Sequence, residues 1–320
     1  MFKLEFVIAA KSTLIYYKII VSKHNAHEDA IWSVISSNTS NRIITSSVDE
    51  CIKIWCDSTG KLLGLIKDLD FAFVSIDLDS TETKLISTNM GHFIEIWDIS
   101  TCSLINRIQA GPLNAWKAIF VNGDRNAVTG TGKGTLLLWD LNTDETNIDN
   151  NQQKSYFATL DTTKNHHINA ISSDSNNTVF AANDIGCVYS FDLKTNQLIS
   201  EFTSHSDIVR ALCVEKDSNI LYSCSDDKRI IAYDLRFKNS IMSLQAHESW
   251  VTNLSLSQDQ NLLLSSSADS TVKLWDIRGK SVVQSYSKHK SEVWDVSWKN
   301  SVDSKFISVG EDAKIIIYEN

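Results

Sequence analysis

Two sets of residues in this sequence have the types and spacing that chemistry requires. The stretch GTGKGT, residues 130–135, resembles the glycine-rich loop that holds the phosphates of a nucleotide in a kinase. Histidine, aspartate and serine also recur together, for example as His247, Asp269 and Ser267, which are the residue types of a hydrolase triad. The first set would indicate a phosphotransferase and the second an acyl hydrolase. The elements that position these residues decide between a catalytic and a structural interpretation.

Both sets belong to a repeat of about 42 residues. Seven short apolar runs end in an aromatic residue, and successive aromatics are 42, 42, 52, 42, 42 and 43 residues apart. The long spacing contains a polar insertion at residues 143–154. The aromatics are Trp55, Trp97, Trp139, Phe191, Tyr233, Trp275 and Tyr318. Runs such as NLLLSSSADSTVKLWDI have the pattern of two strands joined by a tight turn, so each repeat predicts a small antiparallel sheet.

A histidine and an aspartate mark four of the seven repeats at constant distances from the aromatic. The histidine precedes the aromatic by 28 or 29 residues, and the aspartate precedes it by six. The pairs are His27 with Asp49, His205 with Asp227, His247 with Asp269, and His289 with Asp312. Repeats 2 to 4 lack both marks. Because a buried histidine needs an acceptor and a buried carboxylate needs donors, residues that are present or absent together are expected to be in contact.

We expect these residues to form structural networks, because a catalytic nucleophile must be exposed beside its base in one pocket. The expected networks also include Ser47, Trp55, Ser225, Tyr233, Ser267 and Trp275. In repeat 3, Lys133 occupies the place of the aspartate, so GTGKGT is predicted to be a hairpin turn. A phosphate loop would need glycine at Ala127 and a following helix, whereas LLLWDLN predicts a strand.

These features resemble the WD-repeat family, in which the same period, His–Asp–Trp marks and WD dipeptides occur; the dipeptides here are at 97–98, 139–140 and 275–276. The resemblance covers essentially the whole chain and implies an all-β fold, a seven-bladed WD40 β-propeller. The last repeat has no outer strand, so we expect an N-terminal strand, with strand character at residues 12–20, to close the ring. The expected single domain, 1–320, has a closing segment at 1–24 and repeats at about 25–66, 67–108, 109–158, 159–202, 203–244, 245–286 and 287–320.

Composition and charge narrow the classes of function. The chain has 320 residues, a net charge of −9 and a pI of about 5.4, without a basic run, so we expect no direct contact with nucleic acid. No stretch approaches the roughly 20 apolar residues of a membrane helix, so we expect a soluble, intracellular chain. The six cysteines form no C-x-x-C pair and are expected to be reduced thiols. We predict no catalytic residue, no metal and no cofactor, and therefore a protein that is not an enzyme.

Residues that differ between repeats are the candidates for partner binding. The fifth residue after each histidine position lies near the start of the expected innermost strand, where a large side chain would lie at the mouth of a central channel. Tryptophan and arginine are frequent anchors of interfaces. We predict a pocket on the top face of the ring, with acidic and amide neighbours that could hold a basic or polar motif. Its residues are Trp32, Trp116, Arg210, Trp250 and Trp294, with the neighbours Asp29, Asn114 and Asp207.

Longer segments resemble a narrower group, the WD-repeat subunits of the superkiller (Ski) complex. The segments are 27–34, 110–116, 246–257, 265–276 and 306–319. This resemblance implies a non-catalytic subunit that binds a tetratricopeptide-repeat scaffold and an RNA helicase, in an assembly that supports exosome-mediated decay of cytoplasmic mRNA. In animals the subunit also serves the polymerase-associated factor (PAF) complex of transcription elongation, and fungal relatives serve meiotic recombination. The implied locations are the cytoplasm and the nucleus, and the implied partner-binding surface is the face that carries the four tryptophans.

An alternative function rests on two short motifs. Residues 233–236 and 275–278 match the W-D-x-R pattern of substrate receptors of cullin–RING ubiquitin ligases. Arginine at this place is common in WD repeats of every function. Co-purification of the cullin adaptor, lost on Arg278→Ala, would indicate this alternative.

Overall fold

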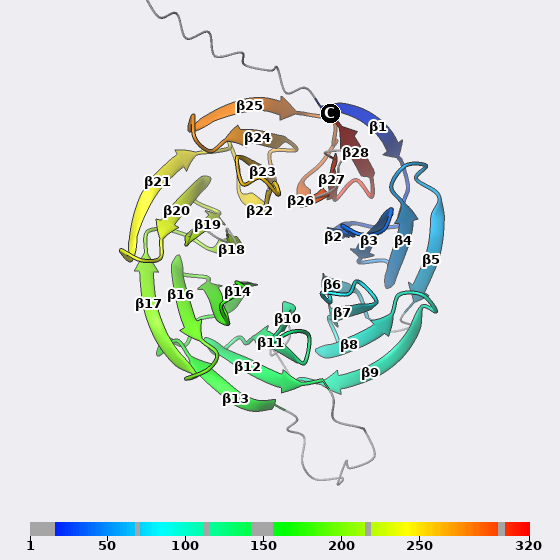
Figure 1. The fold of residues 1–320 in the computed structure, drawn as a ribbon. Helices are drawn as coiled ribbons and strands as arrows, with labels where there is room; N and C mark the ends of the chain where they lie inside the picture. Colours follow the sequence, from blue (N-terminus) through cyan, green and yellow to red (C-terminus); the bar gives the residue numbers. More distant parts are fainter. Residues whose placement is uncertain (1–16, 68–70, 112–115, 142–155, 215–218, 300–304) are drawn as a thin grey trace, which may run out of the picture.

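The computed structural model describes residues 17–67, 71–111, 116–141, 156–214, 219–299 and 305–320. Within them the chain forms seven four-stranded antiparallel sheets, which surround a central axis as the blades of a propeller (Figure 1). The described part of the chain contains no helix. The all-β, seven-bladed fold expected from the repeats is therefore confirmed.

Each of the first six blades is built from four consecutive strands, with the first strand nearest the axis and the fourth on the outer side of the ring (Figure 1). Blade 1 has β2 (Ile31–Ser36), β3 (Arg42–Ser47), β4 (Cys51–Cys56) and β5 (Leu62–Lys67), and blade 2 has β6 (Phe73–Leu78), β7 (Lys84–Asn89), β8 (Phe93–Asp98) and β9 (Ser103–Gln109). Blade 3 has β10 (Ala118–Val121), β11 (Asn126–Gly130), β12 (Thr135–Asp140) and β13 (Tyr156–Asp161), and blade 4 has β14 (Ile168–Ser173), β15 (Thr178–Asn183), β16 (Cys187–Asp192) and β17 (Gln197–Thr203). Blade 5 has β18 (Val209–Val214), β19 (Ile220–Ser225), β20 (Arg229–Asp234) and β21 (Asn239–Gln245), and blade 6 has β22 (Val251–Leu256), β23 (Leu262–Ser267), β24 (Val272–Asp276) and β25 (Ser281–Tyr286).

Blade 7 joins the two ends of the chain. Its inner strands are β26 (Val293–Lys299), β27 (Lys305–Gly310) and β28 (Ile315–Glu319), and its outer strand is β1 (Lys18–Lys23), which pairs antiparallel with β28. The expected N-terminal closing strand is confirmed; it begins at Lys18, within the expected range 12–20, and ends at Lys23. Residues 12–16 of that range lie outside the described residues. Tyr17, just before β1, is buried, and its ring lies 5.7 Å from that of Trp298 and 5.2 Å from that of Phe306.

The hydrophobic core lies between neighbouring blades. In one layer, Ile44 and Ile54 of blade 1 pack in the same cluster as Phe73 and Trp97 of blade 2. Six comparable clusters occur among the described residues. Each blade therefore buries its apolar faces against its neighbours, as expected for a repeat architecture.

The GTGKGT stretch forms the turn between β11 and β12, as predicted. Gly134 has a φ of +79°, and a Cβ added there would lie 1.9 Å from the main-chain oxygen of Lys164. The glycine thus permits a left-handed turn that packs closely against the next loop. It serves the fold, and the phosphate-binding interpretation has no helix to support it.

Candidate functional site: a tryptophan-lined mouth above the central channel

The four histidine–aspartate pairs are in direct contact. In blade 1, Nδ1 of His27 lies 2.9 Å from Asp49, and Nε2 lies 2.8 Å from the hydroxyl of Thr45. The indole Nε1–H of Trp55 donates to the same hydroxyl at 2.9 Å. The corresponding histidine–carboxylate distances in blades 5, 6 and 7 are 2.7, 2.9 and 2.8 Å. All four histidines are buried, so these networks are internal supports of the blades.

The hydroxyl that contacts the histidine differs from the expected one. It belongs to Thr45, Ser223, Ser265 and Ser308, each two residues before the expected serine position or its equivalent. The predicted serines Ser47, Ser225 and Ser267 instead accept the main-chain N–H of the aspartate, at 3.1, 3.1 and 3.0 Å. They brace the turn that holds the carboxylate. The physical reason is that residues two apart on a strand face the same side, so both hydroxyls lie beside the network at different depths.

The blades without the pair keep only part of this arrangement. In blade 3 the indole of Trp139 donates to Thr129 at 2.8 Å, and in blade 2 that of Trp97 donates to Ser87 at 2.9 Å. In blade 4 the side-chain amide oxygen of Asn183 accepts the main-chain N–H of Cys187 at 2.9 Å. Blades 2 and 3 thus keep the bond between the indole and the strand hydroxyl that blades 1 and 6 also have, without the histidine and the aspartate.

The predicted partner-binding residues gather at the top face, which we define as the end of the ring where the innermost strands begin. Trp32, Trp116, Trp294 and Arg210 line a central cavity of about 590 Å³, here called the channel. Together they are called the mouth. Each comes from a different blade, and Trp116 retains 42% of its exposure.

A recurring irregularity in the innermost strands turns two successive residues toward the channel. The pairing of β2 with β3 shifts register between Ile31 and Ser33, and both Trp32 and Ser33 line the cavity. The same shift occurs at the start of β6, β14, β18, β22 and β26. A β-bulge of this kind re-aims side chains without ending the sheet.

Three of the four mouth residues are held in place by contacts with neighbouring side chains. The indole Nε1–H of Trp294 donates to Glu311 at 2.7 Å, and the ring of Trp116 lies edge-on to that of His167, with 5.9 Å between centroids. Two nitrogens of Arg210 donate to the two carboxylate oxygens of Asp226, both at 2.7 Å. This bidentate pair raises the pKa of the Arg210 guanidinium and fixes its plane.

The remaining predicted residues have other positions. Trp250 does not line the channel, but its ring packs under the guanidinium of Arg210 at 5.2 Å, and 45% of the residue is exposed. Asp29 and Asp207 are exposed in the loops just before β2 and β18, here called the rim of the top face. Each accepts the N–H of the following residue, at 2.7 and 2.8 Å. Asn114 lies outside the described residues.

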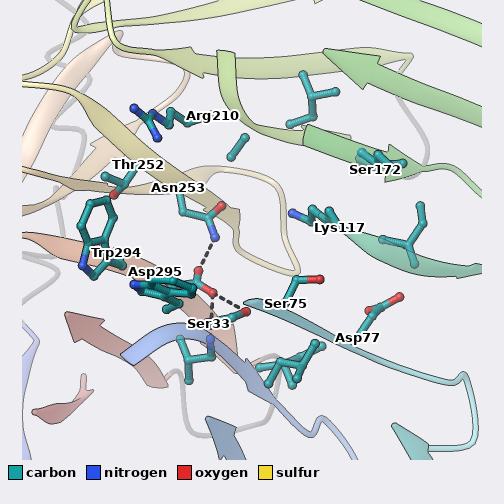
Figure 2. Close-up of a pocket in the computed structure, with 18 of the residues that line it drawn as sticks. Ser33, Ser75, Asp77, Lys117, Ser172, Arg210, Thr252, Asn253, Trp294 and Asp295 are labelled. Atoms are coloured by element: carbon teal, nitrogen blue, oxygen red, sulfur yellow. Dashed lines mark hydrogen bonds between the residues drawn. The ribbon is translucent and has the colours of Figure 1, made fainter. Parts of the chain in front are cut away.

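Sequence reasoning missed the polar wall below the mouth. The sixth residue after each of the seven histidine positions also lines the channel, and six of these seven residues are polar. They are Ser33, Ser75, Lys117, Asn169, Asn253 and Asp295. Asp77 lines the same wall (Figure 2). The signal was available, because these residues vary where the rest of the repeat is regular.

The two carboxylates of this wall join neighbouring blades. Asp295 accepts hydrogen bonds from the Ser33 hydroxyl at 3.0 Å, the Val34 N–H at 2.8 Å and the Asn253 amide (Figure 2). Asp77 accepts the N–H of Phe120 at 3.0 Å. Burial in the channel wall raises the pKa of each carboxyl to about 6, against the effect of these hydrogen bonds.

No cluster of metal-ligating side chains occurs among the described residues. The described chain also has no helix long and apolar enough to cross a bilayer. The arginines of the two W-D-x-R motifs, Arg236 and Arg278, are exposed. The guanidinium group of Arg236 forms an ion pair with Asp234 at 2.8 Å. The mouth presents three indole rings and a guanidinium group, which are surfaces that a protein segment can pack against.

A family model described as "WD domain, G-beta repeat" matches residues 19–56, 196–234, 238–276 and 280–319. These segments end within one residue of the aromatics of the four repeats that carry the histidine–aspartate pair. The chain therefore contains WD40 repeats, and its seven sheets have the arrangement of a seven-bladed propeller.

Several curated proteins are similar to this chain. It is 23% identical to Autophagy-related protein 16 of Arabidopsis thaliana over 198 residues, which cover 61% of this chain and 36% of that protein. It is 24% identical to WD repeat-containing protein VIP3 of Arabidopsis thaliana over 124 residues, 37% of this chain and 39% of that protein. It is 26% identical to Eukaryotic translation initiation factor 3 subunit I of Culex quinquefasciatus over 167 residues, 43% of this chain and 48% of that protein. The chain therefore spans less than half the length of each of these relatives.

Proposed function

We propose that this WD-repeat protein is a non-catalytic interaction subunit whose mouth binds short segments of partner proteins. The observation that carries the proposal is the set of aromatic and guanidinium anchors that are already held in place. Glu311 orients Trp294, Asp226 orients Arg210, and His167 packs against Trp116. Anchors that are fixed before binding lose little conformational entropy when a partner arrives.

The finer proposal is a subunit of the Ski complex, with a tetratricopeptide-repeat scaffold and an RNA helicase as partners in exosome-mediated mRNA decay in the cytoplasm. A second role in the nuclear PAF complex of transcription elongation belongs to the same proposal. Its support is the resemblance of five segments, three of which contain mouth residues or Trp250. These are 27–34 with Trp32, 110–116 with Trp116, and 246–257 with Trp250.

The hydrogen-bonded networks support a structural rather than catalytic use of the histidines. The His247 ring is fully engaged, with Nδ1 on Asp269 and Nε2 on Ser265, and its side chain has no exposed surface. A general base must reach a substrate proton, and this ring is enclosed by its own blade.

The test is affinity purification of the tagged protein followed by quantitative mass spectrometry. The wild type is compared with the Trp32→Ala/Trp116→Ala variant and with a matched control, Phe237→Ala. Phe237 is an aromatic residue with 72% exposure in the turn between β20 and β21, at the opposite end of the ring from the mouth. All three proteins are first compared by their melting temperatures.

We expect the wild type and Phe237→Ala to recover a tetratricopeptide-repeat scaffold with its helicase, or elongation factors. The double variant should lose at least tenfold of this recovery, since anchor residues each contribute about 2 kcal/mol or more. Equal recovery by the folded double variant would exclude the mouth as the binding site. Recovery of a cullin adaptor in place of these partners would favour the ubiquitin-ligase alternative.

A further inference from the structure

The channel below the mouth carries a positive group that its own wall leaves unpaired. Lys117, directly after the mouth residue Trp116, lines the channel, and its amino group is turned into the cavity (Figure 2). It makes no hydrogen bond or ion pair with any other residue that the structure describes. Lys117 directly precedes β10, so the main chain positions it and not a partner side chain.

The charge of Lys117 nevertheless acts on several blades. Burial raises the pKa of Asp77 in blade 2 and of Asp295 in blade 7, and the Lys117 ammonium opposes the rise in both. The same charge acts on the buried thiol of Cys224 in blade 5, whose pKa burial raises. The position of the side chain agrees with this, because Lys117 projects into the channel that Asp77 and Asp295 also line.

The carboxylates near Lys117 are already engaged by the wall. Asp295 accepts three hydrogen bonds, and Asp77 accepts the N–H of Phe120 across the gap to blade 3. On the other side, the amide nitrogen of Asn169 is buried without a partner among the described residues. The side-chain amide of Asn169 is thus a hydrogen-bond donor that is available to a bound segment.

We infer that Lys117 determines specificity at the mouth: the channel below it accepts an uncharged side chain of the bound segment and excludes a basic one. This inference rests on the proposed function. A lysine or arginine side chain entering the channel would meet the Lys117 ammonium, and to pair directly with Asp295 or Asp77 it would have to displace hydrogen bonds that these carboxylates accept from the wall. An acidic side chain would instead face Asp77 and Asp295. An uncharged side chain meets neither repulsion, and a carbonyl or hydroxyl at its tip could accept from Asn169.

Basic residues of the same segment are directed to the rim. Asp29 and Asp207 each have one carboxylate oxygen engaged by their own loop, and both are exposed there. Basic side chains of a bound segment would therefore pair with Asp29 and Asp207 at the rim, whereas Lys117 would repel them in the channel.

The test uses random dodecapeptides displayed on phage and selected on the full chain at pH 8, where both wall carboxyls are ionised. Selections are run on the wild type, on Lys117→Met and on the matched control Lys133→Met. Lys133 is an exposed lysine in the β11–β12 turn of the same blade and does not line the channel. Clones that no longer bind Trp32→Ala/Trp116→Ala are kept, because these use the mouth.

Peptides selected on the wild type should share one uncharged position, at which substitution by lysine weakens binding at least tenfold. On Lys117→Met this penalty should fall below threefold, whereas on Lys133→Met it should stay as in the wild type. A gain of binding cannot arise from a misfolded variant. Lysine tolerated at that position in the wild type, or an unchanged penalty in Lys117→Met, would overturn the inference.

The failures of the two proposals give different results. If mouth-dependent clones are found but Lys117→Met has no effect, only the role of Lys117 is wrong. If no clone depends on Trp32 and Trp116, and the purified partners are also unaffected by that variant, the proposed function is wrong and the inference fails with it.

Discussion

Each aspartate of the four networks keeps its charge through the hydrogen bonds that it accepts. Burial raises the pKa of Asp269, but hydrogen bonds from His247, from Thr271 and from the N–H of Glu248 hold it well below its usual range. Burial also lowers the pKa of His247, only partly offset by Asp269, so the ring is neutral at pH 7. A neutral ring can donate from Nδ1 to the carboxylate and accept the Ser265 hydroxyl at Nε2.

Removing Asp269 should therefore leave a buried donor without an acceptor. We expect Asp269→Ala to lower the free energy of unfolding by about 2 kcal/mol, the cost of an unsatisfied buried group. Lys133→Ala changes the same position of blade 3, which lacks the pair and where the side chain is exposed. Urea unfolding should show a change within about 0.5 kcal/mol for this control. Equal effects of the two substitutions would mean that the network adds nothing to stability.

The pKa of Asp295 gives the channel wall a measurable pH dependence. Its folded value of about 6 lies above the unfolded value of about 4, so the native state binds more protons between these pH values. The resulting contribution to stability is largest at acid pH and is lost as the pH rises through 6. Relative to Asp295→Asn, the wild type should lose about 1.4 kcal/mol between pH 5 and pH 8.

Urea unfolding of both proteins at pH 5, 6.5 and 8 checks this difference. The other ionisable groups are the same in both proteins, so their contributions cancel in the comparison. The exposed Glu248→Gln variant should follow the wild type throughout. A constant offset between wild type and Asp295→Asn at all three pH values would contradict the raised pKa.

At the scale of single residues, the sequence predicted which histidine meets which aspartate, because the two marks keep a constant spacing. It did not predict the bridging hydroxyl. Ser265 and Ser267 both face the network side of β23, and only the three-dimensional depth of the His247 ring selects Ser265. The pairing of Arg210 with Asp226 was also not predicted, because it joins β18 to the turn after β19 without a mark that the other repeats share.

At the scale of elements, the turns that join β11 to β12 and β10 to β11 offer a direct comparison of two glycines. Gly134 and Gly123 have positive φ values of +79° and +63°, but only Gly134 faces a close neighbour, since a Cβ at Gly123 would meet nothing within 4 Å. Alanine at Gly123 should cost about 1 kcal/mol for the left-handed backbone alone. Alanine at Gly134 should cost a further 1–3 kcal/mol or so, because it would displace the main chain of Lys164.

Thermal unfolding of the two variants measures this difference directly. The comparison also decides why the GTGKGT stretch contains its glycines. A larger loss for Gly134→Ala than for Gly123→Ala supports close packing of the turn against the next loop. Equal losses would show that the backbone conformation alone selects glycine at both sites.

Strand boundaries were predictable where the repeat is regular and not where pairing decides them. The N-terminal strand was expected at 12–20 from its β propensity, but β1 is set by its register with β28, in which Ile19 faces Tyr318 and Lys23 faces Ile315. The bulges at the start of the innermost strands were also not predictable. They allow Trp32 and Ser33 to line the channel together, whereas strict alternation would turn one of them away.

At the scale of the whole molecule, stability depends on the seam where the first and last blades meet. The seam contains hydrogen bonds from Ser33 and Val34 to Asp295, and the Ser36 hydroxyl donates to the main-chain oxygen of Trp298 at 2.9 Å. Below these, the ammonium group of Lys299 contacts the Asp57 carboxylate, with both side chains no more than 3% exposed. A closed ring has no free edge, so weakening this one seam should lower the stability of all seven blades.

Lys299→Met should destabilise the entire ring, because Asp57 then stays buried and, among the described residues, has Lys305 at 4.0 Å as its one remaining cationic partner. Breaking a buried ion pair by removing one partner costs about 3–5 kcal/mol. Lys164→Met is the matched control, since Lys164 pairs with Glu201 where both side chains are about one third exposed, and it should cost less than about 1 kcal/mol. The double variant Lys299→Met/Asp57→Asn should recover much of the loss, since no uncompensated charge is then buried. If Lys299→Met unfolds in one transition at a lower temperature, the seam supports the ring as a unit. An early, separate transition would instead show that blades 7 and 1 can part while the others remain folded.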